Sequence, residues 1–196
     1  HPGPTPKLLS LGDVIRLSSN IGIVQFAERL TPQEEFEALR DFGLGAPTGL
    51  PYSAEASGTL RPPPAWSRQT PASMAMGYEV AVTPLQLALS YAAIANGGEL
   101  LEPVLVKEVR DPAGAVTFRA TRRVVRRVIP EDVARTMRGL LTGVVEGGTG
   151  VGGGYGPATG IVPAEPDPRL ATDGKFFYPK YKTPAASIIA QALFAI

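Results

Sequence analysis

Residues 84–95 are almost entirely apolar, and this segment restricts the possible folds of the chain more than any other. The residues Thr83-Pro84-Leu85-Gln86 have the pattern of a capping box with proline at the first helical position. Asn96-Gly97-Gly98 supplies a C-terminal stop. A helix that is apolar on all sides is stable in water only when other elements surround it. We therefore expect a buried helix over about 84–95 inside a folded domain.

The composition fits one folded domain. The chain has 196 residues, of which 44% are hydrophobic, and this is enough to bury one core. Its net charge of +1 gives no electrostatic reason to expect nucleic acid or an anionic membrane as a partner. The absence of cysteine excludes disulfides, thiolate metal sites and a cysteine nucleophile. No apolar run reaches the roughly 20 residues of a membrane span.

Apolar spacing and turn residues predict the order of the elements. We expect a helix over about 11–29, interrupted near Asn20-Ile21-Gly22, and further helices over about 32–42, 130–147 and 184–196. We expect strands over 103–110, 116–119 and 122–129, the first two joined by a turn at 111–114. Residues 43–76 are rich in Gly, Pro and Ser and predict a long loop. The order indicates a mixed α/β domain of the α+β type, with helices around an antiparallel sheet.

Two segments each allow two interpretations. The arginine-rich residues 121–127 could form a basic patch, but their alternation with valine favours a strand with one solvated face. The loop around Tyr52, Glu55, Trp66 and Arg68 could gate a cleft or contact a partner. A covering loop pinned by Trp66 is the favoured alternative, because a buried tryptophan usually anchors packing.

Several blocks of the sequence resemble one known family. Ser18-Ser19-Asn20-Ile21-Gly22 and residues 77–88 resemble the transpeptidase domain of penicillin-binding proteins. The pattern looks most like the class B enzymes of septal or elongation peptidoglycan synthesis. Matching blocks also occur, in the same order, at residues 41–49, 58–66, 93–98 and 145–150. The resemblance implies the penicillin-binding/β-lactamase-like transpeptidase fold.

The resemblance also implies a mechanism and a set of ligands. In that family the serine of a Ser-x-x-Lys motif attacks the penultimate D-alanine carbonyl of a stem peptide, and β-lactams mimic that peptide. Ser18 and Asn20 occupy the Ser-x-Asn motif, so Ser18 would relay protons and Asn20 would hold the substrate amide and the lysine. The implied partners are stem peptides, β-lactams and other cell-wall synthesis proteins, with no nucleic acid. The implied location is extracytoplasmic, in an anchored parent protein, and no cofactor and no metal is expected.

The other two motifs of the family are missing. No serine in the sequence is followed three residues later by lysine, and Lys182-Thr183-Pro184 has proline where Lys-Thr-Gly requires glycine. We expect an incomplete domain that begins after Ser-x-x-Lys. Residues 1–150 would form the close match, 151–157 a glycine-rich junction, and 158–196 a weaker match to the C-terminal strand and helix. The junction is interpreted as a linker or a splice, since a phosphate-binding loop would need a following Gly-Lys-Ser/Thr.

Two classes of function remain open at this point. The first is part of a D,D-transpeptidase, and the second is a non-catalytic module that keeps the fold and binds peptidoglycan or a protein. A generic hydrolase is weakly supported, because the sole histidine is His1 and no Gly-x-Ser-x-Gly motif occurs.

Overall fold

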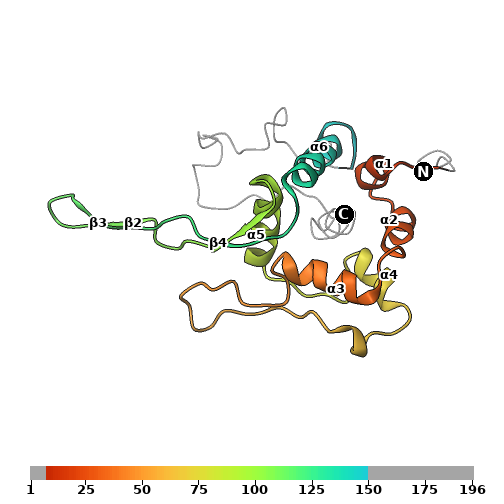
Figure 1. The fold of residues 1–196 in the computed structure, drawn as a ribbon, viewed down its shortest axis with the longest axis horizontal. Coiled ribbons are helices and arrows are strands. Elements are labelled where there is room, and N and C mark those ends of the chain that lie inside the picture. The colour runs from red at the N-terminus through yellow and green to blue at the C-terminus, as the bar shows by residue number, and fades with distance from the viewer. Residues whose placement is uncertain (1–7, 150–196) are drawn as a thin grey trace, which may run out of the picture.

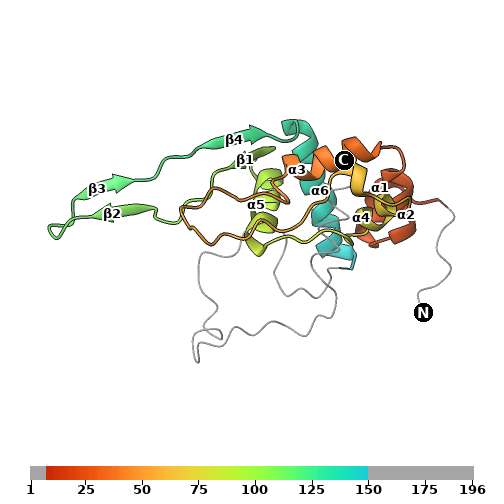
Figure 2. The same cartoon turned by 90° about the horizontal axis from the view of Figure 1, so that it is seen from below.

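The computed structural model describes residues 8–149, which form a body of helices from which a long β arm extends (Figures 1 and 2). The body contains the helices α1 (Leu11–Arg16), α2 (Asn20–Ala27), α3 (Pro32–Asp41), α4 (Thr70–Ala75), α5 (Pro84–Ala95) and α6 (Glu131–Gly147), and the 3₁₀ turn η1 (Pro63–Ala65). The strands are β1 (Glu99–Leu101), β2 (Glu108–Arg110), β3 (Val116–Arg119) and β4 (Val124–Arg127).

One hydrophobic core joins the helices. Helix α1 packs against α2 and α6, α2 packs against α4, and α5 packs against α6. The largest apolar side chains that are fully enclosed are Ile15, Ile23, Met74 and Ile94, which come from four different helices. Burial of a side chain of this size contributes about 1.5–3 kcal/mol. The packing of these helices therefore fixes the position of α1 and α2, where the candidate site lies.

The predicted helix over 84–95 is confirmed, with its capping box. The Thr83 side chain accepts a hydrogen bond from the Gln86 backbone N–H at 3.1 Å, and the Gln86 side chain accepts one from the Thr83 N–H at 2.9 Å. A second capping box, between Thr31 and Glu34, opens α3 as its sequence predicts. Both helices start where their local sequence satisfies the first free N–H groups.

The prediction that residues 84–95 are buried on all sides is wrong for the described structure. Ala88, Ala92 and Ala95 are exposed, whereas the polar residues Gln86 and Ser90 are fully buried. Alanine leaves little apolar area in water, so its exposure costs little. The buried polar groups are paired, because the Ser90 hydroxyl donates to the Leu87 carbonyl oxygen at 2.8 Å and Gln86 makes several hydrogen bonds.

Gln86 also fixes the long loop that precedes it. Its side-chain amide donates to the carbonyl oxygens of Ala46 at 2.7 Å and Ser57 at 2.8 Å. Further along the loop, the Trp66 ring packs against the core and its indole N–H donates to the Arg61 carbonyl oxygen at 2.6 Å. These contacts support the interpretation of a covering loop pinned by Trp66.

The four strands form two antiparallel pairs. Strand β1 pairs with β4 beside the body, and β2 pairs with β3 to form the outer arm (Figure 2). The predicted turn at 111–114 is confirmed by hydrogen bonds from the Gly114 N–H to the Asp111 carbonyl and from the Asp111 N–H to the Ala115 carbonyl, both of 2.9 Å. Gly114 has a φ of +86°, which glycine adopts readily.

The strand predictions are only partly correct. The strand predicted over 103–110 is confined to Glu108–Arg110, because Pro103 has no N–H to donate and residues 103–106 pair with no strand. The strand predicted over 122–129 is shortened to Val124–Arg127, and the predicted strand over 116–119 is correct. Strand β1 was not predicted, because three residues carry no periodic signal.

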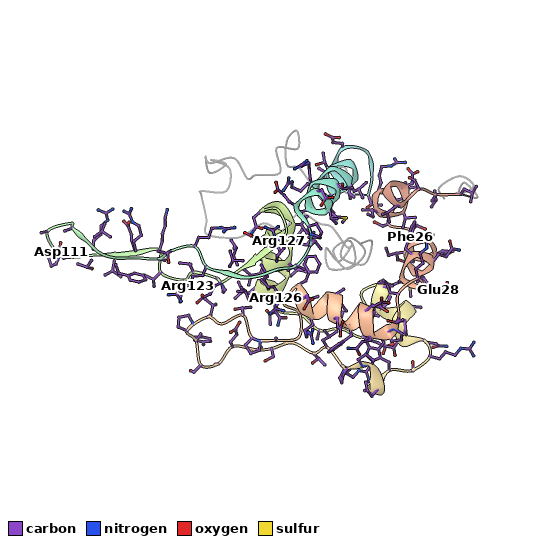
Figure 3. All side chains as sticks on the ribbon, in the orientation of Figure 1. Phe26, Glu28, Asp111, Arg123, Arg126 and Arg127 are labelled. Carbon is purple, nitrogen blue, oxygen red and sulfur yellow. The ribbon has the colours of Figure 1, made fainter. Side chains whose placement is uncertain are left out.

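The arginine-rich segment forms a strand stabilised by ion pairs. Glu99 binds Arg122 and also Arg127, the latter at 2.7 Å, and Arg126 lies 3.4 Å from the Asp41 carboxylate. Figure 3 shows Arg126 and Arg127 near the body and Asp111 at the far tip of the arm. All four residues of β4 are exposed, so both faces are solvated rather than the one that was expected. The segment is therefore a solvated strand, as favoured above.

Residues 43–76 are not wholly a loop, since they contain η1 and α4. Helix α4 has only six residues, too few to give a helical period. The predicted helix over 184–196, the junction at 151–157 and the C-terminal match over 158–196 lie outside the described residues. Within residues 8–149, every helix is too short or too polar to cross a bilayer.

Candidate functional site

The Ser18-Ser19-Asn20 segment is the junction between α1 and α2. The Ser18 N–H donates to the Ile15 carbonyl oxygen at 3.1 Å, and the Ser19 N–H donates to the Val14 carbonyl oxygen at 2.9 Å. These two bonds form a Schellman motif, which satisfies the last carbonyl groups of α1. The helix predicted over 11–29 is therefore interrupted at residues 17–19, just before the position expected from the sequence.

Ser18 has an unusual backbone conformation. Its φ is +51°, in the left-handed region where a Schellman motif usually has glycine. A side chain in this region costs about 1–2 kcal/mol relative to the ordinary conformation. This cost falls on Ser18, which is one of the two residues that the sequence predicts to be catalytic.

The next residue begins α2 without any intervening loop. The Ser19 side chain accepts a hydrogen bond from the Gly22 N–H at 3.2 Å and so caps α2, whose first residue is Asn20. A Cβ atom on Gly22 would lie 2.5 Å from a methyl carbon of Val14, so only glycine allows α1 and α2 to approach this closely. The sequence Ser-Ser-Asn-Ile-Gly thus ends one helix, caps the next and packs the two together.

A pocket of about 600 Å³ opens at the start of α2. Its polar lining includes Ser19, Asn20, Gln25 and Arg29. The Arg29 guanidinium lies over the Phe26 ring, with its carbon 4.7 Å from the ring centre, in a cation–π contact. Amide and guanidinium groups around an apolar wall suit a ligand that carries a carbonyl or a carboxylate.

The end of α6 lies against the end of α1, as both ribbon views show (Figures 1 and 2). The Thr149 N–H donates to the Arg16 carbonyl oxygen at 3.0 Å, and the Arg16 side chain donates to the Gly147 carbonyl oxygen at 3.1 Å. The Ser18 and Thr149 hydroxyl oxygens lie 2.8 Å apart. Residues 16, 18, 147 and 149 thus form one hydrogen-bonded seam.

Asp13 orients Arg16 within this seam. The Asp13 carboxylate accepts from the Arg16 guanidinium at 2.9 Å and from the Ser10 hydroxyl at 2.8 Å. Chiefly the Arg16 hydrogen bond, and then that of Ser10, holds the pKa of Asp13 below its usual value. The carboxylate therefore stays ionised near neutral pH, and the Arg16 side chain remains directed along the seam.

The structure places the two predicted site residues differently. Asn20 lines the pocket, whereas Ser18 is not part of its lining and its hydroxyl faces Thr149. Sequence reasoning assigned no role to Arg16 or Thr149. The block of residues 145–150 was noted as part of the resemblance, but nothing in it indicated a contact with Ser18.

Comparison with known proteins gives one consistent result. The model of the family described as the penicillin binding protein transpeptidase domain matches residues 3–163. The penicillin-binding protein PbpB of Mycolicibacterium smegmatis is 37% identical over 51% of this chain and 15% of its own length. The peptidoglycan D,D-transpeptidase FtsI of Escherichia coli is 35% identical over 53% of this chain and 18% of its own length.

The solved structures agree. Penicillin-binding protein 3 of Mycobacterium tuberculosis, solved with ampicillin and with aztreonam, has a TM-score of 0.63 and 34% identity. The match covers 70% of this chain and 30% of that protein. The chain therefore spans less than a fifth of the two relatives named above and under a third of this solved structure.

Proposed function

Because the chain belongs to the penicillin-binding protein transpeptidase family, we propose that it is part of a peptidoglycan D,D-transpeptidase in which Ser18 and Asn20 serve acyl transfer. Its fold is the mixed α/β fold of these transpeptidase domains. We take these 196 residues to hold part of the domain, with residues 1–150 as the close match and residues 158–196 as a weaker match after the glycine-rich junction.

The strained conformation of Ser18 is the observation that carries this proposal. A turn selected for stability alone would have glycine at this position, as most Schellman motifs do. Strain in a single residue is often retained where its side chain has a function. Asn20, two residues after Ser18, is the first residue of α2 and lines the pocket, so its amide lies at a surface that a ligand can reach.

The chemistry assigns each residue a distinct task. Acyl transfer begins when a serine oxygen attacks the penultimate D-alanine carbonyl of a stem peptide, and the terminal D-alanine leaves with a proton. A hydroxyl can both accept and donate a proton, which suits Ser18 to a relay, and an amide such as Asn20 can bind the substrate backbone. The attacking serine and its lysine must lie outside this sequence, since it contains no Ser-x-x-Lys.

The ligands follow from the same proposal. Stem peptides are the substrates, and β-lactams acylate the same serine, in keeping with the ampicillin and aztreonam complexes of the solved relative. Stem peptides are cross-linked outside the cytoplasm, so we place the domain there, in a parent protein that is anchored to the membrane. Contacts with other cell-wall synthesis proteins belong to this proposal as well.

The experiment is the intact mass of the full-length protein that contains these residues, before and after incubation with benzylpenicillin. A single stoichiometric adduct is the expected result. Reversible binding of a stem peptide without any adduct would instead support a non-catalytic module that keeps the fold. The 196-residue chain alone serves as the control, because its mass should remain unchanged.

A further inference from the structure

We infer that Thr149 is a positioning residue for Ser18, and that it fixes the direction of the Ser18 hydroxyl during acyl transfer. The inference rests on the proposed function of Ser18. Its basis is the 2.8 Å contact between the two hydroxyl oxygens. Every other hydrogen bond given for Ser18 uses its backbone, so this contact is what the described part of the chain offers its side chain.

Thr149 is suited to orient another hydroxyl because its own backbone and side chain are restrained. Its N–H is bound to the Arg16 carbonyl oxygen at 3.0 Å, two residues before Ser18. Its β-branched side chain has restricted freedom about the first torsion angle. The backbone of Ser18 is fixed by the Schellman motif, so both ends of the hydroxyl pair start from rigid positions.

The neighbouring residues keep this geometry in place. Gly148 has no side chain, so the backbone of α6 can approach the Arg16 carbonyl closely. The Arg16 side chain reaches back to the Gly147 carbonyl oxygen and to Asp13. The seam is therefore held by backbone bonds and an ion pair that do not involve the Thr149 hydroxyl.

The magnitudes favour a role in orientation over one in stability. Thr149 is exposed, so water competes for the hydrogen bond between the two neutral hydroxyls and this bond adds little to the stability of the fold. A free serine hydroxyl rotates to suit any partner. With Thr149 as its partner, the Ser18 hydroxyl is confined to the directions that a relay between two fixed groups requires.

The test uses the full-length protein that contains these residues and two substitutions of similar shape. Thr149→Val removes the hydroxyl and keeps the branching, whereas Thr149→Ser keeps the hydroxyl. The matched control is Thr136→Val, another exposed threonine, whose hydroxyl donates to the Asp132 carbonyl oxygen of its own helix at 3.0 Å. Stopped-flow acylation by benzylpenicillin gives the acylation rate constant and the dissociation constant of the initial complex separately.

We expect Thr149→Val to lower the acylation rate constant about 10-fold to 100-fold, because misplacement of a reacting group has effects of this size. The dissociation constant should stay unchanged. Thr149→Ser and Thr136→Val should react like the wild type. In a Ser18→Ala background, Thr149→Val should have no further effect, because the group that it positions is gone.

The outcomes separate this inference from the proposed function. A wild-type protein that forms no adduct would refute the proposed function and the inference with it. A wild-type protein that reacts, together with a Thr149→Val variant within about twofold of it, would refute only the inference. Equal losses from Thr149→Val in the wild-type and Ser18→Ala backgrounds would show that Thr149 acts without Ser18, which also overturns it.

Discussion

Gly148 lies so close to Arg16 that a Cβ atom at position 148 would overlap the Arg16 carbonyl oxygen. The same Cβ atom would lie 2.9 Å from the Val144 carbonyl oxygen, on the last turn of α6. The backbone at the end of α6 therefore lies directly against the backbone at the end of α1. The next residue along the chain, Thr149, contacts Ser18.

Gly148→Ala should destabilise the protein by about 1–3 kcal/mol, because the overlap is with backbone that cannot move aside. The matched control is Gly143→Ala inside α6, where a Cβ atom would meet nothing within 4 Å among residues 8–149. Since alanine is the better helix former, the control should gain about 0.5–1 kcal/mol. Thermal unfolding of both variants gives the comparison. A Gly148→Ala protein as stable as Gly143→Ala would contradict the close backbone contact between Gly148 and Arg16.

The backbone conformation of Ser18 predicts which of its variants is the more stable. Ser18→Ala and Ser18→Gly both remove the hydroxyl, but only glycine relieves the cost of the positive φ. Ser18→Gly should therefore be more stable than Ser18→Ala by about 1 kcal/mol. Urea unfolding measures the difference. Equal stabilities would mean that residue 18 does not adopt the left-handed conformation.

Local signals explain which parts of the fold could be predicted. The capping boxes at Thr31 and Thr83 depend on residues three positions apart, so the starts of α3 and α5 are readable from the sequence. The break after α1 is a Schellman motif with serine in place of the usual glycine, and the expected signal is missing. Strand β1 exists because β4 pairs with it, and local sequence does not encode that pairing.

The candidate site also contains residues that could be predicted from the sequence and residues that could not. Ser18 and Asn20 could be named because they form a short motif with a recognisable family resemblance. The contact between Ser18 and Thr149 joins residues 131 positions apart, and it depends on how α1 packs against α6. Spacing along the chain carries no information about such a contact, so Thr149 emerges only from the structure.

The hydrogen bonds of the Gln86 side chain should anchor the long loop. Gln86→Leu should cost about 2–4 kcal/mol, because the Ala46 and Ser57 carbonyls and the Thr83 N–H each lose their partner. Limited proteolysis should then cut residues 46–58 faster than in the wild type. Gln33→Leu is the control, since Gln33 is exposed and occupies a similar place at the start of α3. Unchanged cleavage in Gln86→Leu would count against this anchor.

Glu35 should make stability depend on pH. Its carboxyl group is fully buried and its two oxygens make no hydrogen bond in the described part of the chain, so burial raises the pKa of Glu35 to about 7. The neutral form is favoured in the folded state. The contribution of Glu35 to the free energy of unfolding is therefore complete below the ordinary pKa of 4.5 and is lost as the pH rises towards 7. The total loss is about 3 kcal/mol.

Glu35→Gln isolates this effect, because the amide does not ionise. The carboxylates of Asp13, Glu34, Glu55 and Glu99, whose pKa values are lowered, act in the opposite direction but are present in both proteins. The unfolding free energy of the wild type minus that of Glu35→Gln should fall between pH 4.5 and 7 and then level off. A difference that does not vary with pH would mean that the Glu35 carboxyl is solvated and keeps its ordinary pKa.

The most direct test of the account is the rate at which benzylpenicillin acylates the full-length protein when Asn20 is changed. Asn20→Ala should lower the second-order rate constant by at least about 100-fold, because a bound amide is lost where the acyl group must be held. Gln33→Ala, which removes an exposed amide at the start of α3 outside the pocket lining, should react within about threefold of the wild type and serves as the control. If Asn20→Ala reacts as fast as the wild type, the Ser18-Ser19-Asn20 turn is not part of the reactive site, and the account is wrong.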